Sequence, residues 1–374
     1  MKSGWQTKPF EGCIEKVSYT SKIQRKDFLD AGAYPIISQE DASINGYWDT
    51  EADLFHVTIP IVVFGDHTKV LKYVDFDFVL GADGVKVLQP LDFLLPKFFF
   101  YQLRAAILDS LGYARHYKLL KELEIAYPGR SEQQRIVGIL DEAFDGIAAA
   151  KANAEKNLQN ARALFESHLQ SVFTQRGEGW EDKTLEQIAT TFGRGKSKHR
   201  PRNDKILYGG KYPFIQTGDV RNSEHFITEY SQTYSDTGLA QSKLWPKGTI
   251  CITIAANIAE TGILSFDACF PDSVIGLVTN QQEADVGFVE YLLQSFKARI
   301  QAMGQGSAQA NINMGTFENE RFPFPSVPEQ KQIVAKLDNL RAETQRLESI
   351  CQRKLAALDA LKKSLLHQAF SGHL

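Results

Sequence analysis

The chain has 374 residues, more than one hydrophobic core usually serves, because cores tend to divide beyond about 250 residues. Its 43% hydrophobic and 23% charged residues are typical of a globular protein and exclude a disordered one. No apolar run approaches the roughly 20 residues that cross a bilayer, and the first residues lack an apolar signal segment, so we expect neither secretion nor membrane insertion. The formal net charge of −3 excludes a uniformly basic DNA-coating protein but allows local basic patches.

Residues 1–126 predict a first globule of mixed α and β structure. Strand-like runs span Val57 to Phe64 and Val85 to Leu88, and a helix-like run spans Pro96 to Leu108. The segment carries 14 basic and 17 acidic residues, so any surface that binds nucleic acid must be a local patch. A short basic stretch precedes Tyr34-Pro35 and contains Lys16, Lys22, Arg25 and Lys26.

Residues 127–177 predict one long amphipathic helix. Its apolar residues, among them Ile136, Leu140, Ile147, Leu158 and Val172, recur mostly at intervals of three and four. Pro128 and the segment 131–134 are start signals, and Gly177 is a stop signal. A helix from about 131 to 175 has a length of roughly 67 Å. Such a helix is too long for one small domain, and its narrow apolar stripe requires a partner.

Residues 178–323 predict a second mixed globule, again with 14 basic and 17 acidic residues. Strand-like runs span Gly248 to Ile254 and Val274 to Val278, and a helix-like run spans Phe288 to Met303. The clearest basic segment of the chain is interleaved with Gly193, Gly195 and Pro201, and contains Arg194, Lys196, Lys198, His199, Arg200, Arg202 and Lys205. A flexible loop with so many donors suits phosphate oxygens.

Residues 324–374 repeat the first helical segment. Shifted by 197 positions, residues 128–173 match residues 325–370 without a gap, with 13 identities in 46 positions. The globules repeat more weakly: Gly4-Trp5 resembles Gly179-Trp180, and Tyr34-Pro35-Ile36-Ile37 resembles Tyr212-Pro213-Phe214-Ile215. A duplication in which the helices stayed similar while the globules diverged indicates a common frame that carries two different recognition units.

The natural partner of each long helix is the other copy, packed as a coiled coil. We expect an α+β protein in which two globules are separated by two long helices in an antiparallel coiled coil, with a pseudo-two-fold, cyclic arrangement. The predicted segments are 1–126, 127–177, 178–323 and 324–374. Parallel packing is the alternative that the repeat leaves open. The unit of about 150 residues between the helices is long enough to span one helix, so it allows the antiparallel pair without requiring it. A further alternative is that both helices are core helices of one large domain.

Candidate DNA contacts are the basic and polar side chains that recur at matching places in the two globules. Before each helix lies a polar stretch, Gly112 to Lys118 and Gly306 to Asn313, whose Arg, Lys, Gln and Asn side chains suit base edges in a major groove. The full predicted set is Lys22, Arg25, Lys26, Ser38, Gln39, His67, Arg115, His116, Lys118, Arg194, Lys196, Lys198, His199, Arg200, Gln216, Thr217, Arg221, Asn257, Ser307, Gln309 and Asn311.

The sequence lacks the motifs of the common catalytic classes. Gly193 to Ser197 resembles the end of a Walker A loop, but Thr190 stands where that motif requires glycine. No G-x-S-x-G, H-E-x-x-H or G-x-G-x-x-G occurs, and the histidines show no spacing suited to a metal. The four cysteines are far apart, which argues against a zinc ribbon or a disulfide scaffold and fits a reducing cytoplasm. We therefore expect no catalytic centre, metal or cofactor in this chain.

Both long helices begin with proline followed by Glu-Gln-x-x-Ile, at Pro128 with 132–136 and at Pro325 with 329–333. With the alternating globules, this pattern resembles the specificity subunit of type I restriction–modification systems. Tyr212 to Val220, and Gly306 to Asn313 running into 322–325, are similar to that family's target-recognition domains. The first globule departs from the pattern, because no Gly-Asp follows Tyr34 to Gln39. The resemblance covers the whole chain.

The resemblance implies a cytoplasmic, non-catalytic reader of double-stranded DNA. Each globule would recognise one half of an asymmetric, bipartite sequence, and the helix pair would fix the spacer between the halves. Two methyltransferase subunits holding S-adenosylmethionine would dock on the helices, and restriction subunits using ATP would join them. Two unlike modules on one chain fit an asymmetric target, which a homodimer of identical modules does not.

Two other functions remain as hypotheses. A coiled-coil adaptor whose globules bind proteins explains the helices and the modest net charge, but not two basic loops in corresponding places. A free-standing endonuclease or methyltransferase would show activity as an isolated chain, and the missing motifs argue against it.

Overall fold

The computed structural model describes residues 4–109, 111–112, 114–255, 257–304, 312–371 and 374. By its contacts the chain divides into two compact units: Met1–Lys156 with Cys351–Leu374, and Asn157–Ile350. Each unit therefore combines one globule with a part of both long helices. The four-segment division by residue range stays a prediction.

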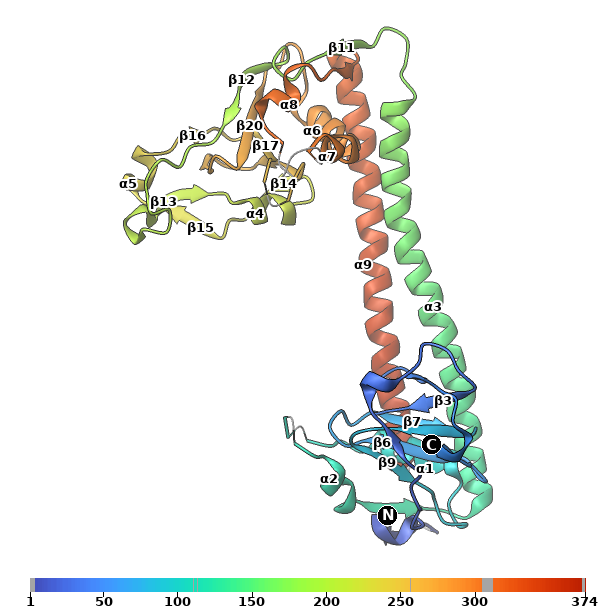
Figure 1. Cartoon of the computed structure of the whole chain (residues 1–374). Coiled ribbons are helices and arrows are strands. Elements are labelled where there is room, and N and C mark those ends of the chain that lie inside the picture. Colours follow the sequence, from blue (N-terminus) through green and yellow to red (C-terminus); the bar gives the residue numbers. More distant parts are fainter. Residues whose placement is uncertain (1–3, 110, 113, 256, 305–311, 372–373) are drawn as a thin grey trace. The chain divides into compact units, whose positions relative to one another are not determined.

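The two long helices are α3 (Arg130–Thr174) and α9 (Val327–Ser371), which lie side by side (Figure 1). In the first unit Lys362 lies over the ring of Phe144 and Lys151 donates to Asp359, so residue numbers rise along α3 as they fall along α9. In the second unit Arg162 on α3 donates to Glu348 on α9. The predicted antiparallel pairing is confirmed, and the parallel alternative is wrong.

The first globule combines short sheets with two helices. Its strands form the pair β1 (Gln6–Pro9) with β10 (Glu124–Tyr127), a sheet of β2 (Lys22–Ile23), β8 (Phe78–Gly81), β3 (Tyr34–Ile37), β4 (Gly46–Trp48) and β5 (Leu54–Phe55), and a sheet of β7 (Leu71–Val74), β6 (Ile61–Gly65) and β9 (Val85–Leu88). The helical elements are α1 (Pro96–Ala105), α2 (Tyr117–Lys121) and the 3-10 turns η1 (Phe10–Cys13), η2 (Arg25–Asp27) and η3 (Glu51–Asp53). Phe98, Phe99 and Leu103 of α1 pack against Ile136 and Leu140 of α3, which attaches the globule to the helix pair.

The second globule has the same kinds of layers with larger sheets. Its strands form the pair β11 (Glu181–Lys183) with β21 (Phe322–Phe324), a sheet of β12 (Ala189–Arg194), β20 (Val274–Thr279), β17 (Ile250–Thr253), β18 (Thr261–Leu264) and β14 (Phe226–Ile227), and a sheet of β15 (Gln232–Tyr234), β13 (Tyr208–Phe214), β19 (Ala268–Cys269) and β16 (Leu244–Trp245). The helical elements are α4 (Thr217–Asn222), α5 (Asp236–Ala240), α6 (Val286–Ser295), α7 (Lys297–Gly304), α8 (Met314–Glu318) and the 3-10 turn η4 (Lys205–Leu207). Phe288 and Leu292 of α6 pack against Phe173 and Leu337 of the long helices.

A buried glutamine makes the same three hydrogen bonds at the start of each long helix. Gln133 accepts from the Leu95 amide and donates to the carbonyls of Phe93 and Pro128. Gln330, its counterpart in the repeat, accepts from the amide of residue 285 and donates to the carbonyls of 283 and 325. A buried amide needs such partners because an unpaired buried polar group is costly. The duplication therefore preserved the contacts that join each globule to its helix.

A second contact between globule and long helix, from a tyrosine to an aspartate, is also the same in both copies. The Tyr101 hydroxyl donates to Asp141 at 2.5 Å, and the Tyr291 hydroxyl donates to Asp338 at 2.7 Å. Burial and then the bond to the carboxylate raise the pKa of both tyrosines. Both hydroxyls therefore stay protonated and act as donors at neutral pH.

Most of the predicted strands and short helices differ from the structure in their bounds, three of them by several residues or by a break. The first strand begins at Ile61 instead of Val57, directly after Pro60, which has no amide hydrogen for a sheet. The run from Phe288 to Met303 is divided at Phe296 into α6 and α7. The run from Pro96 ends at Ala105, three residues earlier than predicted.

The four cysteines are free and buried. Among the described residues, no helix combines the length and the apolar character that a membrane crossing requires.

Candidate nucleic-acid interface

The basic segment of the second globule forms a loop that is fastened to the end of α5. The backbone amides of Lys198 and His199 donate to the side-chain oxygen of Gln241 at 2.6 and 3.0 Å, and the Ser242 hydroxyl donates to the Lys196 carbonyl. Gly195 allows the close approach, since a Cβ there would lie 2.3 Å from the carbonyl oxygen of Phe270. The loop leads into the 3-10 turn η4, so it lacks the helix start that a Walker A loop requires. The loop is therefore held by its backbone, which leaves basic side chains to face solvent.

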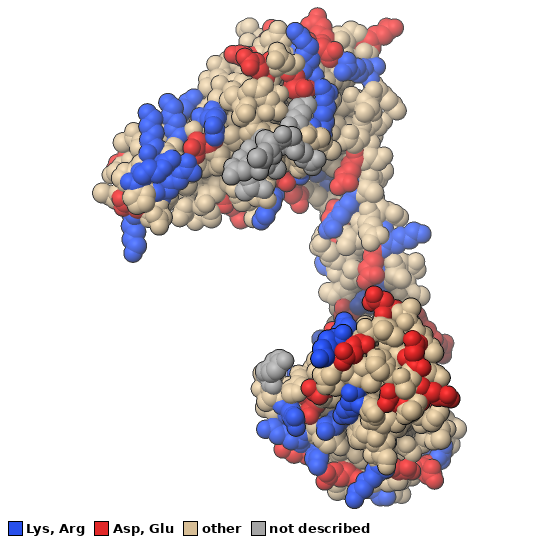
Figure 2. Space-filling view, viewed as in Figure 1, with Lys and Arg blue, Asp and Glu red and all other residues tan. Residues whose placement is uncertain are grey.

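Lysine and arginine side chains gather over α5, β13 and β16 on the face drawn in Figure 2. Lys196, Lys198 and Arg200 are exposed. Lys243 stacks on the Trp245 ring at 3.5 Å, where desolvation and then the charge of Lys196 lower its pKa. Like charges held close together attract an anionic ligand, and this patch therefore suits a phosphate backbone.

Part of the basic segment is neutralised within the globule. Arg202 pairs with Asp272 at 2.8 Å, and His199 contacts Asp204 at 2.9 Å. The Arg194 side chain donates to the carbonyl of residue 272. These three side chains contribute to the fold of the loop. Lys196, Lys198 and Arg200 are exposed and are candidates for phosphate contacts, and one nitrogen of Arg200 also donates to the carbonyls of residues 197 and 199.

Amide side chains lie beside the basic patch in an open hollow of about 630 Å³. Its lining includes Arg202, Lys205, Tyr208, Gln216 and Gln232. The Gln216 amide donates to the Gln232 oxygen at 3.0 Å. Glutamine reads base edges and basic side chains hold phosphates, so the hollow combines the two chemistries that sequence-specific DNA binding requires.

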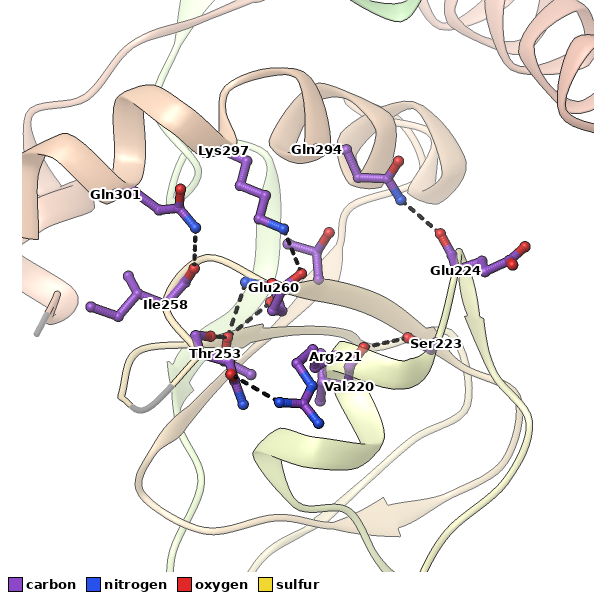
Figure 3. Close-up of polar contacts among 12 residues, drawn as sticks. Val220, Arg221, Ser223, Glu224, Thr253, Ile258, Glu260, Gln294, Lys297 and Gln301 are labelled. Atoms are coloured by element: carbon purple, nitrogen blue, oxygen red, sulfur yellow. Dashed lines mark hydrogen bonds and ion pairs between the residues drawn. The ribbon is translucent and has the colours of Figure 1, made fainter. Parts of the chain in front are cut away.

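Arg221 and Asn257, far apart in the sequence, lie together at the edge of the same globule. Gln216 caps α4, which begins at Thr217, and Arg221 of this helix (labelled in Figure 3) donates to the Asn257 side chain at 3.4 Å. The loop that carries Asn257 is held from α7, where Lys297 pairs with Glu260 at 2.8 Å. A described helix thus supports a polar loop whose side chains can face a ligand.

In the first globule, basic side chains surround two tyrosine rings. Lys22 lies over Tyr19 at 4.7 Å, and Lys86 lies over Tyr117 at 5.2 Å. Desolvation and then the charge of Lys86 lower the pKa of Lys22. Lys26, Arg115 and Lys118 are exposed, while Arg25 is paired with Glu40. This patch therefore combines basic and aromatic side chains.

A buried lysine holds the loop that carries the predicted contacts Ser38 and Gln39. Lys72, 8% exposed, donates to the Ala42 carbonyl and to the Asn45 side chain, whose oxygen also accepts from the Ser38 amide. Burial lowers the pKa of Lys72 to about 8. Gln39 is half-buried and accepts from the amide of His67, so both of these predicted contacts belong to the loop's internal network.

Two predicted DNA contacts have buried side chains. His116 is 1% exposed, with one ring nitrogen on the Asp66 carbonyl and the other accepting from the Leu111 amide. Ser38 is 3% exposed, and its hydroxyl accepts from the Glu40 amide. Both side chains are hydrogen-bonded within the first globule, and their DNA contacts stay predictions. Ser307, Gln309 and Asn311 lie outside the described residues.

Sequence reasoning missed Lys86, Gln232 and Lys243. Each is separated in the chain from the segment it joins, and a repeat search at a fixed shift compares only matching positions. A basic residue close to an aromatic one in the sequence, as Lys243 is to Trp245, was the available signal.

A family model described as the type I restriction modification DNA specificity domain matches residues 2–159 and 177–354. The specificity subunit of the type I restriction enzyme EcoR124I/EcoR124II of Escherichia coli is 25% identical over 356 residues, which are 87% of this chain and 84% of that protein. A putative specificity subunit of the type I restriction enzyme MjaX of Methanocaldococcus jannaschii is 23% identical over 273 residues, 68% of this chain and 60% of that protein.

Two solved structures share the fold. One comes from work on complex assembly and conformational transition of a type I R-M system; it has a TM-score of 0.78 at 17% identity and covers 100% of this chain and 99% of its own. The other is the HsdS subunit of Thermoanaerobacter tengcongensis, with a TM-score of 0.60 at 17% identity, covering 100% and 98%.

Proposed function

Because this chain belongs to the type I restriction modification DNA specificity family and serves DNA target recognition, we propose that each of its globules reads one half of a bipartite sequence. The observation that carries the proposal is the duplication itself. The contacts of Gln133 and Gln330 are the same in both copies, whereas the basic patches are built from different residues, with Lys22 over Tyr19 in the first globule and Lys243 over Trp245 in the second. Two unlike surfaces on one common frame suit two unlike half-sites.

In the second half-site, Lys196, Lys198 and Arg200 hold phosphates while Gln216, Gln232 and Arg221 reach base edges. Phosphate contacts fix position, and base-edge contacts supply sequence preference. In the first half-site, Lys22, Lys86, Arg115 and Lys118 take the corresponding roles. Coupling two modules on one chain raises affinity through effective concentration, so each can be weak by itself.

As a specificity subunit, the chain works with DNA and partner subunits of a type I restriction–modification complex. The finer assignment is that two methyltransferase subunits dock on the helices and that restriction subunits join them. Leu164 on α3 and Leu361 on α9 occupy equivalent positions in the repeat, and both are about half exposed (53% and 47%). Large apolar side chains that face solvent at matching places suit a partner surface that is used twice.

The catalytic chemistry belongs to the partners in this proposal. S-adenosylmethionine would be bound by the methyltransferase subunits and ATP by the restriction subunits, with no cofactor or metal on this chain. The complex would act in the cytoplasm, where DNA is accessible. No comparison supports the alternative of a coiled-coil adaptor.

The test is a footprint of DNA bound by the reconstituted complex of this chain with its methyltransferase subunits. We expect two protected segments separated by an accessible spacer, with binding that weakens steeply as salt rises. The methyltransferase subunits alone are the control. One contiguous protected segment would contradict the bipartite proposal.

A further inference from the structure

In each unit an ion pair joins the long helices, and the charges at matching positions of the repeat are opposite. In the first unit Lys151 of α3 donates to Asp359 of α9 at 2.8 Å, and in the second Arg162 of α3 donates to Glu348 of α9 at 2.9 Å. With the shift of 197, Glu348 occupies the repeat position of Lys151, and Arg162 occupies that of Asp359. Both cations therefore belong to α3 and both anions to α9.

A contact between a cation and an aromatic ring is exchanged in the same way. Lys362 of α9 lies 5.0 Å from the ring centre of Phe144 in the first unit, and Arg341 of α9 lies 4.5 Å from that of Phe165 in the second. Arg341 occupies the repeat position of Phe144, and Phe165 that of Lys362. In these two contacts both rings belong to α3 and both cations to α9. The two helices therefore carry different kinds of side chain at matching positions of the repeat.

Two copies of α3 packed in the same register would bring like charges together. Because Arg162 occupies the place of Asp359, Lys151 of one copy would face Arg162 of the other, twice by symmetry. Two copies of α9 would place Glu348 against Asp359 and Arg341 against Lys362. Part of the apolar seam does not discriminate, since Leu140 and Leu337, and Leu169 and Leu366, are identical pairs of the repeat. In the middle of the seam the helices differ, because Ile147 matches Thr344 and Ala161 matches Leu358. Charges beside an apolar seam are known to set which helices pair.

We infer that the charges at positions 151, 162, 348 and 359 select the pairing of α3 with α9 over association of each helix with its own counterpart in a second copy of this chain. The leucines near both ends of the seam are identical in the two helices and permit either pairing. The charges therefore add to the selection that the differing residues in the middle of the seam exert. If the proposed function holds, this selection makes each helix pair carry two unlike globules, whereas a pair of like helices from two chains would carry identical ones.

The test compares two variants of the full chain that have the wild-type net charge. In R162E/D359K the native pairing places a second lysine, at position 359, against Lys151 and a second glutamate, at position 162, against Glu348. When two copies of this variant pair through like helices, each of these charges faces a charge of opposite sign. The control adds Lys151→Glu and Glu348→Arg to the same two substitutions. It restores opposite charges between α3 and α9 and like charges between identical helices.

Sedimentation velocity over a range of concentrations measures the association constant of each variant. We expect dimer formation by R162E/D359K to be at least about tenfold stronger than by the four-fold control, because several exposed pairs change sign together. The control should match the wild type although it carries more substitutions. Equal association constants for the two variants would overturn the inference, whatever their melting temperatures.

A spin label identifies which helices have paired. Two copies of α3 in this register are symmetric about the junction of Lys156 and Asn157, and Asn157 is exposed. A label at Asn157→Cys should give a short distance between chains in the R162E/D359K background and none in the four-fold control. The same absence of a short distance in both backgrounds would show that any dimer forms elsewhere and would also overturn the inference.

Discussion

At the scale of single residues, burial decides which polar side chains can contact a ligand. His116 and Lys72 are both basic residues close to predicted DNA-contact segments, and both are buried with hydrogen-bond partners inside the first globule. Their hydrogen bonds to backbone carbonyls stabilise loops of the first globule. Sequence reasoning treats every basic residue in a polar stretch as a candidate, because nothing in the stretch records what packs on it.

Lys72→Met should remove one contribution to the dependence of stability on pH. Burial lowers the pKa of Lys72 to about 8, so the folded protein releases this proton below the pH of about 10.5 at which the unfolded chain does. Between these values the unfolded state binds more protons, and the folded state gains stability as pH rises. Relative to K72M, the wild type should gain on the order of 3 kcal/mol from pH 7 to pH 10.5.

Urea unfolding of both proteins across this range measures the gain. Lys26→Met, at an exposed position, is the control and should follow the wild type. A constant difference between wild type and K72M at all pH values would contradict the assigned cause.

At the scale of elements, loops supply the candidate contacts and helices hold the loops. The basic segment after β12 is fastened by Gln241 and Ser242 at the end of α5, and the loop with Asn257 is held by Lys297 of α7. The composition of the basic segment predicted its role, while its anchoring depends on residues about forty positions away. That anchoring determines which of its side chains are exposed.

Reversing the charge of Lys196, Lys198 and Arg200 together should weaken DNA binding by the complex for all sequences alike. Phosphate contacts carry no base information, so specific and non-specific binding should both fall. The slope of log affinity against log salt should decrease by up to about three. Fluorescence anisotropy at several salt concentrations measures both effects.

The control for this loop keeps the charges and changes the side chains, as K196R/K198R/R200K. It should retain the salt slope of the wild type, since the number of cations is unchanged. A triple reversal with wild-type affinity and slope would show that the loop does not contact phosphates.

At the scale of the whole molecule, the two proposed recognition surfaces belong to different units. Gln133 and Gln330 make the same contacts in the two units. The candidate base contacts differ, because Gln216 and Gln232 belong to the second unit and Arg115 and Lys118 to the first. Under the proposed function, a substitution that alters base contacts in one unit should leave the half-site of the other unit unchanged. Independence of the half-sites follows from the proposed function.

Replacing Gln216 and Gln232 by alanine should relax one half of the modified sequence and leave the other unchanged. A lost pair of base-edge hydrogen bonds removes about 1–3 kcal/mol of discrimination at one base pair. Methylome sequencing of a host that carries the variant with its methyltransferase partner reports both halves. Replacing Arg115 and Lys118 is the reciprocal variant, which should affect only the other half. Changes in both halves from either variant would contradict independent reading.

The amino-acid sequence by itself determined the two long helices, because their signal is local: apolar residues every three or four positions, start and stop residues, and a second copy that repeats the register. It also predicted the basic segment of the second globule, since clustered charge is visible in composition. Tertiary structure alone decided that the helices run antiparallel, that Lys151 and Arg162 face acidic partners on α9, and that Lys243 joins Lys196 while His116 is buried. These features depend on contacts between residues far apart in the chain, and periodicity and composition describe only neighbours along it.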